Sequence, residues 1–466
     1  MNVFYDRERE LAALNRSWEA PSAQFALLYG RRRVGKTYLV RHFLRDRPHA
    51  FFLASQVSLA ESMTQLATSV LRAFPSGGYV PADLPTLQSI LQFVTNAAKE
   101  HRVGLVLDEF QYLVEQDPSI PSRIQAWWDT DGLRSNVFLI LCGSHLGLMA
   151  RIGGPQAPLF GRFTFRYKLP PMDYTSVACF YANSDYTARD KLAAFAVLGG
   201  TPRYHAACDL SRSLAENICR LVLDPLGLFH NEPEVLLLSS QIRDLTPFNS
   251  ALAAVANGCT KFNEIAQRTS VSSAQLAYYL RALTEMDWVC KEMPFGETAE
   301  RRAVYRIADN FISFWYRFVS PNRSQMEVND PEEAFARIVQ PSLNEFIGSL
   351  AFEGICLQFV RMHDSALLGQ KVTRAARYWS RDGSLEIDLV AELADGSYLF
   401  GECKWSSSPI GVSVYYSLRD KIALMQESYR RSVRYIIFSA AGFDDALRET
   451  AQRDGILLVE AAQLLA

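Results

Sequence analysis

Fully apolar runs alternate with amphipathic stretches through the first 170 residues. Buried strands are predicted where the apolar runs are short and uninterrupted, at residues 24–30, 49–55, 103–110, 136–144 and 163–170. The stretches between them have a helical pattern, as where Leu39, Val40, Phe43 and Leu44 share one helix face. Buried strands that alternate with helices favour a mostly parallel sheet, so residues 1–170 are predicted to form an α/β domain.

The pattern becomes helical after Pro170 and Pro171. This part contains the turn LGGTPRYH at residues 198–205. We predict that residues 171–240 form a small helical lid attached to the sheet domain.

Short helices follow from residue 241. Two are predicted at 248–257 and 261–268, and Ser272 or Ser273 can cap a third. Two short strands, WVCKEMP and AVYRIAD, would close this part as a wing. Residues 241–320 are therefore predicted to be a winged helix-turn-helix.

The last domain is predicted over residues 321–466. The polar, turn-rich stretch 320–333 reads as the linker into it. A helix, a hairpin of LEIDLVAEL and SYLFGECKW, a helix, the strand VRYIIFS, a helix and the strand GILLVE follow in that order. This order predicts a second α/β domain.

Composition places the chain among ordinary globular proteins. Of its 466 residues, 49% are hydrophobic and 21% are charged, which excludes a largely disordered or fibrous chain. At about 150 residues per domain, this length accommodates about three domains. The formal net charge of −2 excludes a polybasic binder and leaves any nucleic-acid contact to local patches.

Cysteine usage and the N-terminus indicate the compartment. The 8 cysteines are scattered without a Cys-x-x-Cys pair, as in a reduced protein. The charged start MNVFYDRERE lacks the apolar core of a signal peptide. The apolar runs are shorter than the ~20 residues that a membrane helix needs. We therefore expect a cytoplasmic protein that has no membrane-spanning segment.

A glycine-framed loop joins the first predicted strand to its helix. Its sequence GRRRVGKT matches G-x-x-x-x-G-K-[ST], in the strand-to-helix position that this phosphate-binding motif requires. The glycines let backbone N–H groups approach a phosphate, Lys36 brings charge to the β and γ oxygens, and Thr37 offers its hydroxyl to Mg²⁺. ATP with Mg²⁺ is the expected ligand, bound by Gly30, Arg31, Arg32, Arg33, Val34, Gly35, Lys36 and Thr37.

Polar residues end two further predicted strands. Asp108 and Glu109 follow VGLVL, where a P-loop ATPase holds its metal and its attacking water. Asp108 is expected to bind Mg²⁺ through water, and Glu109 to polarise the attacking water. Ser144 ends the strand NVFLILCG, where it can sense the γ-phosphate or orient the water.

Several short motifs occur in a specific order and spacing. FYDREREL is followed by GRRRVGKT, LVLDEFQYL, LCGSH, PLFGR and LGGTPRY. Together they resemble the archaeal-type ATPase family of the STAND branch of AAA+-like P-loop NTPases. RIADNFISFWYRFVSPN and the hairpin EIDLVA…GECKW resemble the uncharacterised C-terminal domain that commonly accompanies this ATPase in prokaryotes. The resemblance covers nearly the whole chain.

The resemblance implies a core ATPase, a winged-helix module and a C-terminal domain similar to PD-(D/E)XK nucleases, which is restriction-endonuclease-like. It also implies that Arg162, in PLFGR, is an arginine finger or sensor. Pro202 and Arg203 would lie at the lid near the nucleotide. His145 follows Ser144 where the family often has a second small polar residue, which is a departure from its pattern.

A second group of ionisable residues lies in the last domain. Asp388 is on LEIDLVAEL, while Glu402 and Lys404 are two positions apart on SYLFGECKW, so alternation points both to one face. Two carboxylates can hold Mg²⁺, and Lys404 can orient or deprotonate the water that attacks a phosphodiester. Glu353, on the preceding helix, fits the additional acid that the resemblance implies for this metal group.

The turn of the hairpin decides whether the two strand acids meet. A two-residue turn would pair Asp388 with Cys403, so that Asp388 faces away from Glu402. A three-residue loop, 394–396, with Gly396 in the left-handed region, places Asp388 opposite Glu402. We predict the three-residue loop and one shared divalent ion. A structural ion-pair cluster is the alternative explanation.

Three functions are compatible with these features. The first is an ATP-hydrolysing protein that acts on DNA, in which the ATP state positions the winged helix and a Mg²⁺-dependent nuclease-like domain cleaves or grips nucleic acid. The second is a STAND-type regulatory switch with a non-catalytic C-terminal domain, and the third is a transcription regulator. We favour the first because both acids and the lysine are present.

The partners expected beside ATP follow from the same features. DNA is the expected macromolecular partner, and a homo-oligomer or a protein partner stays open. The outward positions of the third short helix carry one basic residue, so packing against the ATPase explains this helix at least as well as DNA binding does. These positions are Ser273, Gln275, Tyr278, Arg281 and Glu285.

Overall fold

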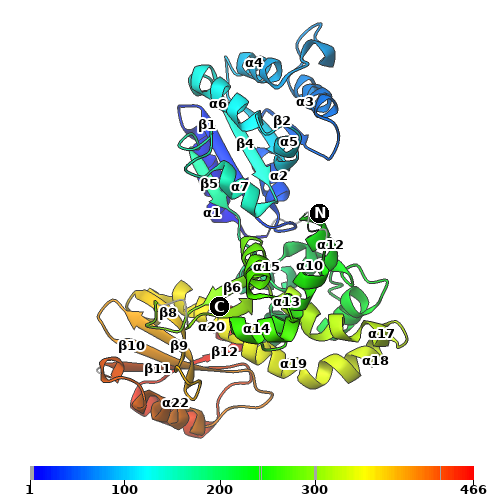
Figure 1. Cartoon of the computed structure of the whole chain (residues 1–466). Helices are drawn as coiled ribbons and strands as arrows, with labels where there is room; N and C mark the ends of the chain where they lie inside the picture. Colours follow the sequence, from blue (N-terminus) through cyan, green and yellow to red (C-terminus); the bar gives the residue numbers. More distant parts are fainter. Residues whose placement is uncertain (1–4, 241, 243, 299–301, 431) are drawn as a thin grey trace. The chain divides into compact units, whose positions relative to one another are not determined.

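A computed structural model of the chain describes residues 5–240, 242, 244–298, 302–430 and 432–466. Two compact units make up the protein, and we call Met1–Pro171 unit 1 and Met172–Ala466 unit 2. Each unit has its own sheet, and Figure 1 labels the elements of both.

A five-stranded parallel sheet forms the centre of unit 1 (Figure 1). Its order is β2-β3-β4-β1-β5, with every neighbouring pair parallel. Strands β1, β3 and β4 are buried along their whole length because helices cover both faces. The five predicted strands are confirmed as β1 Gln24–Tyr29, β2 His49–Leu53, β3 Val103–Asp108, β4 Val137–Gly143 and β5 Phe165–Lys168.

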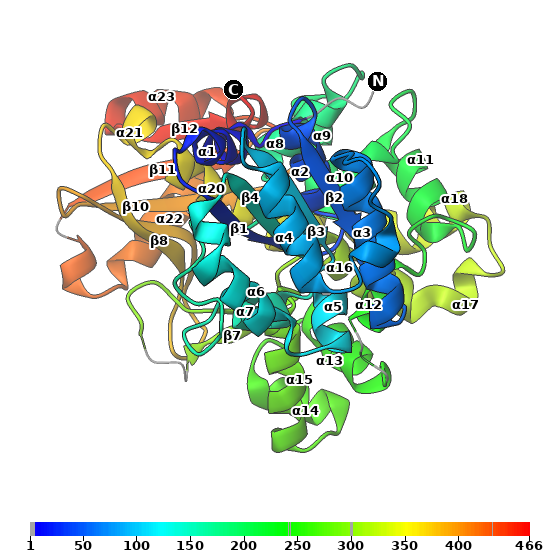
Figure 2. The same ribbon diagram turned by 90° about the horizontal axis from the view of Figure 1, so that it is seen from above.

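Two separate apolar layers cover the faces of this sheet. On one face, Leu14 of α1 and Val40 of α2 pack on Leu28. Helices α3 to α7 cover the other face, and Figure 2 shows α3 and α4 side by side there. The helices are α1 Glu8–Glu19, α2 Lys36–Leu44, α3 Leu59–Ala73, α4 Leu87–Ala97, α5 Gln111–Gln116, α6 Ile120–Thr130 and α7 Leu146–Ile152, with short turns η1 Pro81–Asp83 and η2 Gly132–Arg134.

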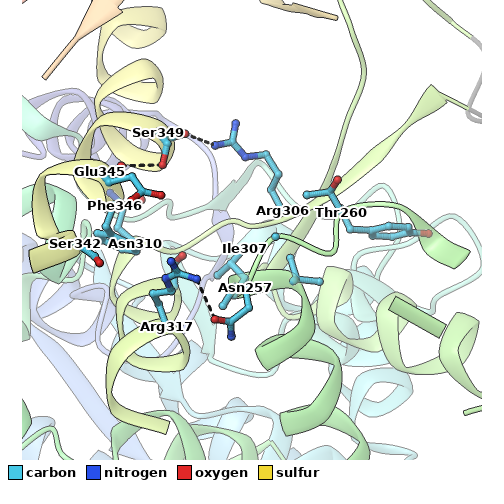
Figure 3. Close-up of a pocket in the computed structure, with 15 residues that line it drawn as sticks. Asn257, Thr260, Arg306, Ile307, Asn310, Arg317, Ser342, Glu345, Phe346 and Ser349 are labelled. Carbon is cyan, nitrogen blue, oxygen red and sulfur yellow. Dashed lines mark hydrogen bonds between the residues drawn. The ribbon is translucent and has the colours of Figure 1, made fainter. Parts of the chain in front are cut away.

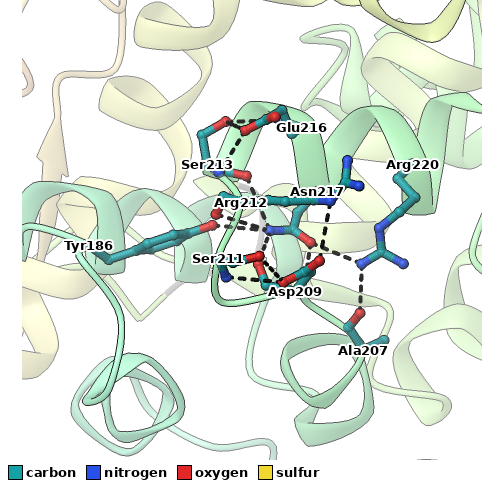
Figure 4. A network of polar contacts seen from close by, with 9 residues as sticks. All are labelled: Tyr186, Ala207, Asp209, Ser211, Arg212, Ser213, Glu216, Asn217 and Arg220. Carbon is teal, nitrogen blue, oxygen red and sulfur yellow. Dashed lines mark hydrogen bonds and ion pairs between the residues drawn. The ribbon is translucent and has the colours of Figure 1, made fainter.

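Unit 2 begins with short helices, as the pattern after Pro171 predicts. Polar side chains hold their connections: Asn217 Oδ1 accepts from the backbone N–H of Asp209 at 2.8 Å, and its Nδ2 donates to the Asp209 carbonyl at 2.9 Å (Figure 4). The elements are α8 Tyr174–Ala178, η3 Cys179–Tyr181, α9 Ala188–Leu198, α10 Pro202–Ala206, α11 Leu214–Ile218, η4 Cys219–Leu223 and α12 Glu232–Ser239.

Three helices and a two-stranded antiparallel hairpin follow, in the predicted order. Ser272 caps the third helix, since its hydroxyl accepts from the backbone N–H of Gln275. The predicted inward residues of that helix, Leu276, Leu280 and Leu283, are buried. The elements are α13 Thr246–Ala256, α14 Phe262–Thr269, α15 Ser273–Glu285, β6 Val289–Glu292 and β7 Val304–Ile307.

The C-terminal part of unit 2 is a mixed sheet flanked by helices. Its order is β12-β11-β10-β9-β8, antiparallel from β8 to β10 and parallel from β10 to β12. The strands are β8 Val372–Trp379, β9 Glu386–Leu393, β10 Tyr398–Lys404, β11 Val433–Ser439 and β12 Leu457–Glu460. The helices between the strands and after them are α22 Ser413–Ala423, η10 Glu427–Arg430, α23 Asp445–Asp454 and α24 Ala461–Leu464.

The stretch predicted as a linker is mostly helical instead, with a turn at 327–330 between two short helices. Met326 of this stretch and Ala334 directly after it are buried in the main apolar core of unit 2, which the polar composition of 320–333 does not predict. The helical segments before β8 are α16 Asn310–Phe314, η6 Trp315–Val319, η7 Ser320–Asn322, α17 Arg323–Met326, α18 Pro331–Ala334, η8 Phe335–Val339, α19 Gln340–Phe346, η9 Ile347–Phe352, α20 Glu353–Met362 and α21 Asp364–Leu368.

The main apolar core of unit 2 draws on each of its predicted parts. It includes Leu198 of the predicted lid, Phe248 of the three-helix part and Leu389 of the C-terminal sheet. The predicted boundaries near residues 240 and 320 therefore do not separate independent compact units. The reason is that each part leaves an apolar face which only the next part covers.

Within the described ranges, one helical stretch is long and apolar enough, by length and composition alone, to cross a membrane. It is Pro331–Met362, and 53% of its most apolar window is buried within the protein. Its residues Phe346, Phe352 and Phe359 belong to the core of unit 2. A core helix of a globular protein has these properties.

Candidate nucleotide site and carboxylate–lysine site

The phosphate-loop residues 30–35 connect β1 to α2 at the carboxyl edge of the sheet of unit 1. Gly30 must be glycine, because a Cβ there would lie 2.5 Å from the carbonyl oxygen of Leu169. Gly35, directly before α2, has φ +95°, a left-handed conformation that glycine adopts without strain. The backbone geometry of this turn therefore favours glycine at both positions of the motif.

Lys36 is buried inside the loop that it follows. Its Nζ donates to the carbonyl oxygens of Gly30 at 2.9 Å and Arg31 at 2.8 Å. Burial lowers the pKa of Lys36, while the carboxylates of Glu109 and Asp108 act in the opposite direction. The ammonium group thus stands at the place where the motif requires a partner for phosphate oxygens.

Thr37 and Asp108 meet directly. The Thr37 hydroxyl donates to Asp108 Oδ2 at 2.6 Å, and Asp108 Oδ1 accepts from the backbone N–H of Glu109 at 2.9 Å. Asp108 is fully buried, and this burial raises its pKa although the hydrogen bond from Thr37 lowers it. A hydroxyl and a carboxylate side by side are the hard oxygen donors that suit Mg²⁺.

Glu109 belongs to a polar cluster at the ends of β3 and β4. Its Oε2 accepts from the hydroxyl of Ser144 at 2.7 Å and from Nε2 of Gln111. Gln111 Nε2 also donates to Ser144 Oγ at 3.2 Å, which closes the triangle. The backbone of Glu109 has φ +51°, an uncommon value for a residue with a side chain, and such strain concentrates at functional sites.

Gln111 was not predicted from the sequence, although it lies two residues after Glu109 in LVLDEFQYL.

The three arginines of the phosphate loop have different surroundings. Arg31 is buried, and Arg32 Nη2 donates to the hydroxyl of Tyr112 at 2.8 Å. Arg33 has φ +68°, and Val34 packs in the core under the loop.

The role of Arg162 as an arginine finger or sensor stays a prediction, and the structure places Arg162 away from the phosphate loop of its own chain. Arg162 precedes β5, whose first residue Phe165 pairs with Ala26, so it lies toward the amino ends of the parallel strands. The phosphate loop follows the carboxyl end of β1. Arg162 instead makes two hydrogen bonds of 2.8 Å to the carboxylate of Asp129, which raises the pKa of Arg162.

Pro202 and Arg203 belong to unit 2. Pro202 is the first residue of helix α10, where proline fits because no N–H is needed. His205 on the same helix is fully enclosed, which lowers its pKa to about 4, and its Nε2 is bonded to the carbonyl of Gly199 at 2.7 Å. Contact of Pro202 and Arg203 with a nucleotide stays a prediction.

The hairpin between β9 and β10 has the predicted three-residue loop. The Leu393 N–H donates to the Ser397 carbonyl at 2.9 Å, and Gly396 has φ +80°. The register pairs Gly401 with Leu389, so the next pair in line is Glu402 with Asp388. The two acids therefore lie opposite each other, as the sequence predicts.

Two lysines neutralise these acids. Lys404 Nζ contacts Glu402 Oε2 and lies 3.6 Å from Asp388 Oδ2, and Lys421 of α22 lies 2.6 Å from Glu402 Oε1. Burial raises the pKa of Asp388, and the neighbouring Glu402 raises it further. Burial acts against the charge of Glu402 too, but the two ammonium groups outweigh it and lower its pKa.

Glu353 does not join Asp388 and Glu402 as a third ligand. Its Oε2 lies 2.7 Å from Arg377 Nε on β8, in a buried ion pair. Burial raises the pKa of Glu353 to about 7 although Arg377 opposes this. Among the residues that the structure describes, no three acidic, histidine or cysteine side chains form a group able to hold a metal ion. Arg377 and Lys421, whose contacts depend on distant strands and helices, were not predicted as members of this site.

The loop between β6 and β7 packs on the C-terminal sheet. Phe295 N–H donates to the Arg377 carbonyl at 2.7 Å, and the Phe295 ring is buried with Ile387 and Phe400. Arg302 Nη2 donates to the Trp379 carbonyl at 2.5 Å. The outward residues predicted for α15, such as Tyr278 and Arg281, are exposed.

Comparison with known proteins supports an ATPase domain in the N-terminal part of the chain. Residues 4–206 match the family described as an ATPase domain predominantly from Archaea. Residues 315–414 match a family described as archaeal and bacterial proteins of unknown function. An uncharacterised protein of Methanocaldococcus jannaschii is 26% identical over 438 residues, which is 92% of this chain and 92% of that protein.

Two shorter or more distant similarities point the same way. An uncharacterised ATP-binding protein of the same organism is 47% identical over 45 residues, 10% of this chain and 76% of that protein. A solved Walker-type ATPase of Pyrococcus abyssi superposes with a TM-score of 0.52 and 22% identity, over 67% of this chain and 96% of that chain. The structural likeness supports the fold.

Proposed function

We propose that this protein, a P-loop ATPase by its fold, its phosphate loop and its family match, uses ATP with Mg²⁺ to act on DNA. The ATP state would be coupled to α13–α15 and the β6–β7 hairpin acting as a winged helix. The carboxylate–lysine site of the C-terminal sheet would cleave phosphodiesters or grip nucleic acid, with Mg²⁺ as its metal. DNA and ATP are then the partners of the same chain.

At the ATP site, the roles follow from the contacts around the loop. Lys36 would exchange the carbonyls of Gly30 and Arg31 for phosphate oxygens. Thr37 and Asp108 would hold Mg²⁺, which supplies charge to neutralise the phosphates. Glu109 would polarise the attacking water, with Ser144 fixing the orientation of the Glu109 carboxylate.

A single observation carries the DNA part of the proposal: Asp388 lies opposite Glu402, with Lys404 within ion-pair distance of both. Two carboxylates and a lysine on one hairpin supply the donors for an ion and a partner for a phosphodiester. Their oxygen chemistry fits Mg²⁺, and an ion bound there would take the place of ammonium groups at Glu402. Lys404 and Lys421 would then be free to face a phosphate.

A regulatory switch with a non-catalytic C-terminal part is the second candidate. Both carboxylate oxygens of Glu402 form ion pairs with lysine ammonium groups, and Glu353 forms an ion pair with Arg377. This is the arrangement of a structural ion-pair cluster. Phe295 of the hairpin loop is buried against the C-terminal sheet, so this loop has a protein partner already. These contacts favour a hairpin that communicates with the C-terminal part.

Incubation with linear, circular and single-stranded DNA, with Mg²⁺ or Mn²⁺ and with or without ATP, tests the proposal. We expect cleavage that needs the metal and disappears in Lys404→Ala. Lys371→Ala, which changes an exposed lysine at the start of the same sheet, is the matched control and should cleave normally. If no DNA form is cut but DNA is bound, the C-terminal part is a binding platform. If DNA is neither cut nor bound, the switch is the better description.

A further inference from the structure

A cavity of about 310 Å³ lies inside unit 2, between the end of α13, strand β7 and the helices around residues 310–349. Figure 3 shows Arg317, Asn257 and Ser342 on its wall, with Arg306 reaching toward Ser349 at another part. Its size is at the lower end of the range for small-molecule sites, about 300–1,000 Å³. The ATP site in unit 1 and the carboxylate–lysine site do not include these residues.

Arg317 is the most informative residue of this cavity. It is half-buried, and Nη1 donates to Asn257 Oδ1 at 3.1 Å. Within the described part of the chain, no carboxylate forms an ion pair with its guanidinium. An arginine that faces a cavity without an acidic partner still has donors for an oxyanion, which it binds with two parallel hydrogen bonds.

The other residues of the wall could bind the polar organic part of a ligand. Hydroxyl and amide groups come from Thr260, Ser313, Ser342, Ser349 and Asn310, and apolar surface comes from Val255, Ile307 and Phe346. The volume exceeds what an inorganic anion fills. Arg306 and Arg317 outnumber the single acid of the lining, Glu345, so the lining favours an anionic ligand.

We propose that this cavity binds a small phosphate monoester with a hydroxyl-bearing body, such as a sugar phosphate or a nucleoside monophosphate. The phosphoryl group binds Arg317 and Asn257, and the hydroxyl groups bind the serines and the threonine of the wall. A phosphoryl group offers more acceptor oxygens than a carboxylate, so it can bond the Arg317 guanidinium and a second donor of the wall at the same time. The site is separate from ATP hydrolysis and from the proposed action on DNA.

Arg306 connects the cavity to the C-terminal site. Its Nη1 lies 3.0 Å from Glu292 Oε2 on β6, and Arg377 lies 3.6 Å from the same oxygen. Arg377 in turn holds Glu353. A ligand that accepts a hydrogen bond from Arg306 competes with Glu292, so Glu292→Gln should free Arg306 and tighten ligand binding.

Calorimetry with ribose 5-phosphate, AMP and ribose tests the site. The full-length protein carries Lys36→Ala, so that the phosphate loop does not bind the probes. We expect at least one phosphate ester to bind and ribose not to bind. Binding of ribose 5-phosphate as well as AMP indicates a sugar phosphate site, and binding of AMP alone indicates a nucleotide site. In this background, Arg317→Gln should weaken binding by about tenfold or more.

Two further variants keep the test decisive. Arg337→Gln changes an exposed arginine that pairs with Glu333 and does not line the cavity, and it should bind as the parent does. Ser342→Phe fills the cavity and leaves Arg317 in place, so it should abolish binding even if Arg317→Gln fails to fold. The proposal is overturned if neither ester binds, or if Ser342→Phe binds as well as the parent. Equal affinity of a folded Arg317→Gln variant also overturns it.

Discussion

Thr37 donates its hydroxyl hydrogen to Asp108 across 2.6 Å, although the two residues are 71 positions apart. Strands β1 and β3 flank β4 in the sheet, and all three end at the same edge because they are parallel. The first turn of α2 therefore meets the end of β3. This contact joins the phosphate loop to the acidic strand end, and the predictions for the ATP site depend on it.

Lys36→Ala should abolish ATP binding. Lys36 is the side-chain charge that the loop geometry delivers to the phosphates, and it is held inside the loop by two carbonyls. Isothermal calorimetry with ATP and Mg²⁺ measures the effect. Lys99→Ala, which removes an exposed lysine of the same unit, is the control and should bind as the wild type does. Equal ATP affinities of Lys36→Ala and the wild type would contradict the assignment of residues 30–37 as the ATP site.

Glu109→Gln should keep ATP binding and slow hydrolysis by about 10²-fold or more. The amide preserves the shape and the contact with Ser144 but cannot polarise water. Single-turnover hydrolysis, with binding measured separately, distinguishes the two effects. Unchanged turnover would move the catalytic role to another residue, with Asp108 as the next to test.

Arg162→Ala should leave ATP hydrolysis within about twofold of the wild type. Its partner Asp129 is partly exposed, and an exposed ion pair contributes less than about 1 kcal/mol to the free energy of unfolding. Steady-state turnover and thermal unfolding check both parts. A large fall in turnover with normal ATP binding would instead mean that Arg162 acts on the nucleotide of a neighbouring copy.

Glu353 should make stability depend on pH. Burial raises its pKa from 4.5 to about 7 in the folded protein, so its contribution to stability is complete below about pH 4.5. This contribution is lost as the pH rises through about 7. Relative to Glu353→Gln, which does not ionise, the wild type should lose roughly 3 kcal/mol of unfolding free energy over this range. Urea unfolding at several pH values measures the difference, and parallel curves would contradict it.

Glu402→Gln should destabilise the C-terminal part of unit 2 by about 2 kcal/mol. Glu402 is 2% exposed, and its loss of charge leaves Lys404 and Lys421 close together without their common partner. The lysine side chains are about one-third exposed, so water reduces the cost. Thermal unfolding measures it, with Glu427→Gln on the exposed surface as the control. An equal midpoint for both variants would show that the ion pairs contribute little.

Local features of the sequence predict much of the candidate sites. The phosphate loop needs only adjacent residues between a strand and a helix, and the strand ends at Asp108 and Ser144 are marked by a change from apolar to polar residues. The register of the β9–β10 hairpin is also local, because a loop of three residues with Gly396 in the left-handed region determines it. Asp388 and Glu402 could therefore be placed opposite each other.

Contacts between distant segments were not predictable in the same way. Arg377 reaches Glu353 from β8, and Lys421 reaches Glu402 from α22, because the sheet order and the packing of α22 bring them there. Neither position has a distinctive motif in the sequence. The same reasoning explains Arg162, whose motif resembles that of a nucleotide-binding arginine but whose strand register puts it at the other edge of the sheet.

The sequence by itself determined the phosphate loop, the strands around it and strands β9 to β12, because these depend on neighbouring residues and on short-range periodicity. It did not predict strand β8, which completes the C-terminal sheet. The tertiary structure alone decided that all parts of residues 172–466 contribute to one main core and that most of 320–333 is helical. It also decided which charges neutralise Asp388, Glu402 and Glu353. Burial and ion pairing are properties of surfaces brought together from distant parts of the chain, and a linear pattern does not contain them.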